Sequence, residues 1–208
     1  MEIINIDFKE AVIQSAHLFE DVLPQQVCLT GGNFGLQLVK GLKKINYNFS
    51  SVDFFLTDER LHCSKNDQNL NLLMRELEKL KNFQVNNFHA FQQTENPESS
   101  YKELVKKISP SFFDVTILSL GDDGHLAGHF ANSHPLEDKR FCYTSDAKKA
   151  PNSRISFDLD FLIKSKQVVL AIFGEEKKNA AKDLINGQGI HSSICKSPTL
   201  KVFTDINL

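Results

Sequence analysis

The chain has 208 residues, of which 41% are hydrophobic and 24% charged, and its formal net charge is −2. This composition is typical of a soluble globular protein, and the absence of a basic excess argues against a general nucleic-acid binder, although a pocket for a small anion needs only a few cations. A chain of this length buries roughly 70–75% of its unfolded surface and folds without disulfides or metal, so we expect one domain over residues 1–208.

The cysteines favour a reducing compartment, because they lie far apart and form no Cys-x-x-Cys pair. They are Cys28, Cys63, Cys142 and Cys195. Charged residues interrupt the apolar runs at the N-terminus, so we expect no signal peptide. No stretch approaches the length of a membrane span. We therefore predict a cytoplasmic protein that contacts neither membrane nor nucleic acid.

The first half of the chain alternates between short apolar runs and helical periodicity. In chain order, we predict a strand at Met1–Phe8, a helix at Lys9–Leu23, a strand at Gln26–Leu29, a helix after Gly35, a strand at Val52–Leu56, a helix at Asn69–Lys81 and a short strand at Val85–Phe91.

The second half continues this alternation. We predict a helix at Pro97–Ile108 ended by Pro110, a strand at Phe113–Leu120, a short helix or turn from His125, a short edge strand at Phe141–Thr144, a strand at Gln167–Phe173, a helix at Glu175–Ile185 and a strand at Leu200–Phe203. Alternating strands and helices indicate a three-layer α/β/α fold with a mostly parallel, Rossmann-like sheet.

Polar clusters follow three of these strands. They are Thr30–Gly35, Thr57–Arg60 and Gly121–His125. Because ligands of α/β proteins bind at the carboxyl ends of the strands, we expect the three clusters to converge on one rim.

Each cluster has a bland and a functional interpretation. Gly31, Gly32 and Asn33 form either an ordinary turn or an anion site made of free backbone amides. Arg60 belongs either to a solvated turn or to a phosphate site, with Asp58 or Glu59 holding its guanidinium.

His125 is the side chain best suited to proton transfer near neutral pH, and Asp123 is placed either to orient its ring or to shape the turn. The alternative is a solvated histidine in a tight turn. Lys149 and Arg154 belong to a basic loop that is either a solvated patch or part of the site. His125 and His129 have the i, i+4 spacing of a zinc pair, but no third ligand is evident, so we expect no metal.

Several of these stretches resemble, in order and spacing, the 6-phosphogluconolactonase family, over about Val27 to Thr204. The matching segments are Leu29–Asn33, Asp58–Arg60, Asp67–Asn69, Gly121–Ala127 with Phe130, and Lys149 with Arg154. The chain departs from the family pattern at Asn33–Gly35, where Ser-Thr-Pro is usual, at Gln68, which replaces a Ser, and in the basic loop, which lacks two prolines.

Glucosamine-6-phosphate deaminases share the scaffold, but their pattern has Tyr at the position of Arg60 and an acidic residue at that of Phe130. The resemblance therefore implies hydrolysis of 6-phospho-D-glucono-1,5-lactone, a step of the pentose phosphate pathway, without a cofactor. It implies His125 as the general base and Asp123 as its partner. The substrate and phosphate contacts implied are Gly31, Gly32, Asn33, Arg60, Lys149 and Arg154, and the division of the three cations between the phosphate and the reaction oxyanion stays open. The alternatives are a sugar-phosphate isomerase or deaminase, and a binding module without turnover. The sequence does not predict the oligomeric state.

Overall fold

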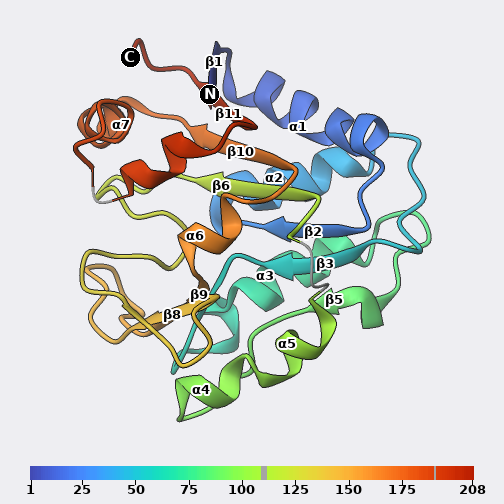
Figure 1. Ribbon diagram of the computed structural model, residues 1–208. Helices are drawn as coiled ribbons and strands as arrows, with labels where there is room; N and C mark the ends of the chain where they lie inside the picture. The colour runs from blue at the N-terminus through green and yellow to red at the C-terminus, as the bar shows by residue number, and fades with distance from the viewer. Residues whose placement is uncertain (109–111, 190) are drawn as a thin grey trace.

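The computed structural model describes residues 1–108, 112–189 and 191–208, and its centre is a seven-stranded sheet (Figure 1). The strands lie in the order β1-β11-β10-β6-β2-β3-β5, and each neighbouring pair runs parallel. They are β1 (Glu2–Asn5), β2 (Gln26–Leu29), β3 (Asp53–Leu56), β5 (Phe88–His89), β6 (Val115–Ser119), β10 (Gln167–Ile172) and β11 (Leu200–Thr204). The predicted parallel sheet is confirmed.

Helices cover both faces of this sheet, which confirms the three-layer α/β/α prediction (Figure 1). Side chains of α1, α2 and α3 pack into the hydrophobic core on one face, and those of α5, α6 and α7 pack into the core on the other. The helices are α1 (Phe8–Val22), α2 (Gly32–Leu42), α3 (Asn69–Leu77), α4 (Pro97–Ser100), α5 (Lys102–Lys107), α6 (Leu159–Leu162) and α7 (Lys178–Ile185). Short 3-10 helices lie at Lys65–Asp67, Val85–Asn87, Glu175–Lys177 and Ser192–Lys196.

The central strands are buried on both faces, because successive side chains point into opposite helical layers. In β10, Val168 and Leu170 pack toward α5, α6 and α7, whereas Val169 and Ala171 pack toward α1, α2 and α3. This double burial explains the near-continuous apolar runs in the sequence. It also explains why polar side chains gather where the strands end.

A second sheet, which the sequence did not predict, is antiparallel and has the order β4-β9-β8-β7. Its strands are β4 (Asp58–Arg60), β7 (His134–Pro135), β8 (Phe141–Thr144) and β9 (Arg154–Phe157). β4 is separated from the end of β3 by Thr57 alone, so this sheet extends from the carboxyl edge of the main sheet. Phe141–Thr144 is therefore an interior strand, and the prediction of an edge strand is wrong.

The helix predicted at Pro97–Ile108 is divided into α4 and α5 at Tyr101, which has φ −105° and ψ −5°. The Tyr101 ring stacks on Phe141 of β8, with centroids 4.3 Å apart, and its hydroxyl donates to Glu98. This packing against the second sheet interrupts the helix where the sequence periodicity does not. Pro110, predicted to end this helix, lies outside the described residues.

Among the described residues, no helix combines the length and the apolar character needed to cross a membrane. That all 208 residues form one domain stays a prediction.

Candidate active site

The turn after β6 carries His125 and is built closely around its imidazole. A Cβ at Gly121 would lie 2.2 Å from Nδ1 of His125, so only glycine leaves room for the ring. The Gly121 amide donates a hydrogen bond of 2.9 Å to the His125 carbonyl. Leu126 then forms isolated bridges with Leu120 and His129. Of the two alternatives predicted for this segment, the turn is confirmed.

Asp123 holds the imidazole of His125. Its Oδ1 accepts a short hydrogen bond from the ring Nδ1 and a second, at 3.3 Å, from the His125 amide. Burial raises the pKa of Asp123, but the hydrogen bonds and the charge of His125 outweigh burial and hold that pKa below its usual value. A proton on Nδ1 leaves the lone pair of the neutral ring on Nε2, where it can accept a proton from water. The same Oδ1 atom therefore both orients the His125 ring and shapes the turn, the two roles considered for Asp123.

Phe130 covers one face of the His125 ring, with centroids 4.6 Å apart and an angle of 21° between the planes. His125 lines a cavity of about 790 Å³, which is within the usual size range of small-molecule sites, ~300–1,000 Å³. The basic loop contributes Lys148 and Asn152 to the lining, and α7 contributes Ala180. The histidine therefore faces a space that a small molecule can enter.

Arg60 and Arg154 lie opposite each other on β4 and β9. Arg154 is 6% exposed; its Nη2 donates to the Lys149 carbonyl at 3.2 Å, and its buried Nη1 has no hydrogen-bond partner among the described residues. Burial lowers the pKa of Arg154 and the nearby Arg60 lowers it further, although Asp58 opposes this. The Gly128 amide donates to Ser156 of β9 at 3.3 Å, so the His125 turn rests against this same strand.

Lys149 reaches from the basic loop to the His125 turn. Its Nζ forms an ion pair with Asp122, the residue next to Asp123. The pair is exposed on both sides, with 55% of the Lys149 and 42% of the Asp122 side chain accessible, so solvent screens it. This arrangement places a cation beside the His125 turn without burying it.

The Gly31–Gly32 turn is the start of α2, which begins at Gly32 and not after Gly35 as predicted. Gly32 has φ +69°, and a Cβ at Gly31 would lie 2.3 Å from the Asn69 side chain. Asn69 Nδ2 donates to the Asp58 carbonyl at 3.1 Å. The first two polar clusters are thus in contact through Asn69, and they follow the neighbouring strands β2 and β3.

Within the described part of the chain neither Asp58 nor Glu59 bonds the Arg60 guanidinium, so the expectation that one of them holds it is wrong. Arg60 Nη1 donates to the Asp67 carbonyl at 3.1 Å. The fully buried Glu59 accepts hydrogen bonds of 2.7 Å from the amides of Arg60, Asn69 and Leu70. It accepts hydrogen bonds from otherwise free amides at the N-terminus of α3. The sequence does not indicate this structural role, because three consecutive charged residues are usually exposed.

Glu59→Gln is expected to lower the free energy of unfolding by about 1–3 kcal/mol, because the new amide nitrogen cannot accept the Leu70 hydrogen bond. Burial raises the pKa of Glu59 to about 7, although its three amide donors lower it. The folded pKa is above the unfolded one, so the stability contributed by protonation is complete at low pH and falls as the pH rises toward 7.

Urea unfolding at several pH values measures both effects, and Glu78→Gln, an exposed change at the opposite end of α3, is the matched control. That control is expected to change stability by less than about 0.5 kcal/mol. Equal stability of the Glu59 and Glu78 variants would contradict the capping role.

Lys177 is a cation that the sequence interpretation did not select. It lies in a 3-10 helix after β10 and lines a cavity of about 460 Å³ together with Asn33 and Ser119. Burial lowers its pKa, while Glu176 and Asp122 raise it and Lys149 lowers it. The sequence signal that would have identified it is a glycine at the end of the parallel strand β10, Gly174, with a lysine three residues later.

The structure brings the predicted residues to one rim but not into one cavity. His125 and Asp123 line one cavity, whereas Asn33 lines the cavity of Lys177, and Arg60 belongs to the lining of neither. The 3-10 helix of Lys177 leads directly into α7, whose Ala180 lines the His125 cavity, so the two spaces are neighbours.

The chain matches, over residues 9–202, the model of a family described as glucosamine-6-phosphate isomerases/6-phosphogluconolactonase. A 6-phosphogluconolactonase of Borreliella burgdorferi is 31% identical over 180 residues, covering 82% of this chain and 75% of the relative. One of Chlamydia pneumoniae is 29% identical over 171 residues, covering 78% of this chain and 66% of the relative.

Solved structures share the fold. The 6-phosphogluconolactonase of Thermotoga maritima superposes with a TM-score of 0.81 at 21% identity, covering 97% of this chain and 96% of its own. That of Shewanella baltica also gives 0.81 at 21% identity, covering 98% and 97%.

Proposed function

Since the chain belongs to the family of glucosamine-6-phosphate isomerases and 6-phosphogluconolactonases, we propose that it hydrolyses 6-phospho-D-glucono-1,5-lactone to 6-phosphogluconate. The observation that carries this proposal is the Asp123–His125 pair, whose imidazole borders a cavity large enough for a sugar phosphate. Phe130, which stacks on His125, occupies the position where the deaminase pattern has an acid, and this favours hydrolysis over isomerisation.

His125 Nε2 takes a proton from a water molecule while the water oxygen attacks the C1 carbonyl of the lactone. The C1–ring oxygen bond then breaks, and the imidazolium returns the proton to the departing ring oxygen, which becomes the hydroxyl of the open acid. Asp123 keeps the Nδ1 proton in place and stabilises the imidazolium during both steps. The substrate ester is reactive, so the mechanism requires no cofactor.

Cations around the rim hold the phosphate and the developing oxyanion. The amides of Gly31, Gly32 and Asn33 lie at the positive end of the α2 dipole, which suits an anion. Lys177 shares a cavity with Asn33, and Lys149 stands beside the His125 turn. Arg60 and Arg154 provide two further cations on β4 and β9.

The direct test is a coupled assay of freshly generated lactone, with the rate of spontaneous hydrolysis subtracted. The wild-type chain is expected to release 6-phosphogluconate well above the spontaneous rate and no ammonia from glucosamine 6-phosphate. Ammonia release without lactone hydrolysis would identify a deaminase. Saturable binding of 6-phosphogluconate without either turnover would identify a binding module. In both cases the proposed activity would be wrong.

The substrate proposed is a small molecule, and the free cysteines agree with the cytoplasmic location expected from the sequence, which stays a prediction.

A further inference from the structure

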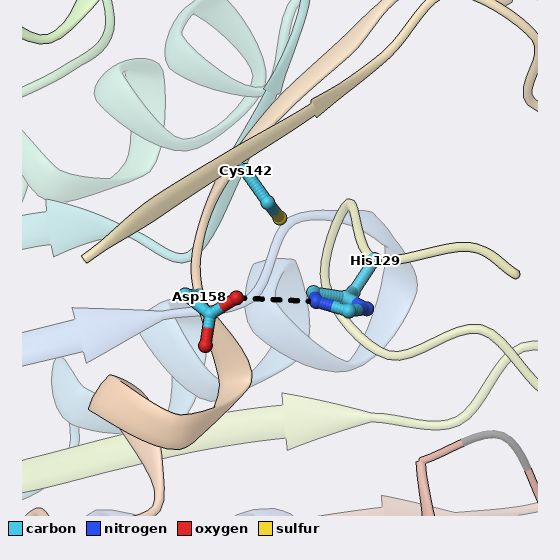
Figure 2. Close-up of side chains that lie close together, drawn as sticks. All are labelled: His129, Cys142 and Asp158. Atoms are coloured by element: carbon cyan, nitrogen blue, oxygen red, sulfur yellow. Dashed lines mark hydrogen bonds and ion pairs between the residues drawn. The ribbon is translucent and has the colours of Figure 1, made fainter. Parts of the chain in front are cut away.

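Behind the His125 turn, three side chains with different donor atoms face one another (Figure 2). They are His129 of the turn, Cys142 of β8 and Asp158, which is the N-cap residue of α6. One ligand atom from each lies within 4.8 Å of the other two. Among the described residues, no other group of three His, Cys, Asp or Glu side chains lies this close together.

The His129–Asp158 contact is poor as a hydrogen bond. Nε2 and Oδ2 are 3.4 Å apart, well beyond the ~2.7–2.9 Å of a charge-assisted bond. Yet two ligands of one tetrahedral zinc ion, each bound at ~2.0–2.2 Å, are separated by about 3.4 Å. The imidazole and the carboxylate are therefore already spaced as ligands of a shared ion.

Hydrogen bonds around the cluster fix the Asp158 carboxylate and the His129 backbone. Asp158 Oδ1 is used in capping α6, where it accepts the Asp160 amide at 2.9 Å, so Oδ2 is left for the cluster. With Nε2 as the ligand, His129 Nδ1 carries the ring proton; this atom is buried and has no hydrogen-bond partner among the residues that the structure describes. His191 Nε2 donates to the His129 carbonyl at 2.6 Å and fixes the backbone of this residue. Cys142 is 1% exposed, and its Sγ lies within 4.8 Å of the ligand atoms of His129 and Asp158.

The donor set selects the class of ion. An imidazole nitrogen, a thiolate sulfur and a carboxylate oxygen suit Zn²⁺ or Co²⁺, whereas Mg²⁺ and Ca²⁺ require oxygen ligands. One thiolate and one carboxylate neutralise a divalent cation. Asp158 also lines a cavity of about 440 Å³ together with Lys139, Arg140 and Lys164, and Arg140 is paired with Asp138 at 2.6 Å.

We propose that His129, Cys142 and Asp158 form a binding site for Zn²⁺ that ties the His125 turn to the second sheet. On binding, the Cys142 thiol releases its proton to solvent, and a water molecule completes the tetrahedron. The pair His125–His129, considered from the sequence, is not this site: His125 is engaged by Asp123, and the missing ligands come from β8 and from the start of α6. The site does not depend on the proposed hydrolysis.

Cobalt titration of the chelator-treated chain tests the site without an activity measurement. The wild-type chain is expected to bind one Co²⁺ with a thiolate-to-cobalt charge-transfer band and the strong d–d absorption of four-coordinate cobalt, and Zn²⁺ should displace both. Cys142→Ser should abolish the charge-transfer band. Asp158→Asn, which keeps the α6 cap, and His129→Gln should each weaken binding at least tenfold.

Cys195→Ser is the matched control, because Cys195 is a free, partly exposed thiol outside the cluster. It should leave the cobalt spectrum unchanged. Zn²⁺ should raise the Tm of the wild-type chain and of this control, but not of Cys142→Ser, and the Tm without metal shows whether each variant folds. The proposal is overturned by the absence of a stoichiometric thiolate band in the wild type, or by a band that persists in Cys142→Ser.

Discussion

His125→Ala is expected to lower kcat for 6-phosphogluconolactone hydrolysis by about 10²–10⁴-fold, the usual contribution of a positioned general base. The imidazole is the proton acceptor in the proposed step, and Ala offers none. KM should change little, because the proposed phosphate contacts lie elsewhere on the rim. Initial rates with freshly generated lactone, corrected for spontaneous hydrolysis, measure the effect.

Two further variants distinguish the loss of a catalytic group from an unspecific effect of substitution on the folded enzyme. Asp123→Asn should lower kcat by a smaller factor, because the amide oxygen can still accept from Nδ1 but no longer stabilises the imidazolium by charge. His134→Ala removes an exposed histidine of β7 and should leave the rate unchanged. A His125→Ala variant with the wild-type rate would show that the assigned base is wrong.

Lys177→Ala is expected to raise KM for the phosphorylated lactone about 10–100-fold, since a charge-assisted hydrogen bond contributes roughly 1.5–3 kcal/mol. Lys177 is the candidate because it shares a cavity with Asn33, at the start of α2, and forms no ion pair with a carboxylate within the described part of the chain. KM for unphosphorylated gluconolactone should change far less. Steady-state kinetics on the two lactones measures this ratio.

Arg60→Ala is the comparison that distinguishes the two cations. Its guanidinium already donates to the Asp67 carbonyl, so we expect a smaller selective effect than for Lys177. Lys182→Ala, an exposed change on α7, is the control and should affect neither lactone. Equal effects of Lys177→Ala on both substrates would refute its phosphate role, and a larger selective effect of Arg60→Ala would assign the phosphate to Arg60.

Local residue chemistry made parts of the site predictable. The Gly121–His125 run follows a strand buried on both faces, and glycines with a nearby acid and histidine form a turn that can orient an imidazole. Glu59 was misjudged, because a charged side chain next to Arg60 looks solvated. Its burial depends on the α3 amides, which lie some ten residues further along the chain.

The sequence by itself determined the order of the main-sheet strands and of most helices between them, because strands buried on both faces and one-sided helices leave distinct hydrophobic periods. It also determined that the polar turns follow β2, β3 and β6, which the sheet then places side by side. Only the tertiary structure decided that Asp58–Arg60 is a strand paired with Arg154–Phe157. It also decided that Lys177 and Asn33 line the same cavity, and that the side chains of His129, Cys142 and Asp158 lie close together. These contacts join segments far apart in the chain, and they depend on packing between layers, which no local pattern of residues encodes.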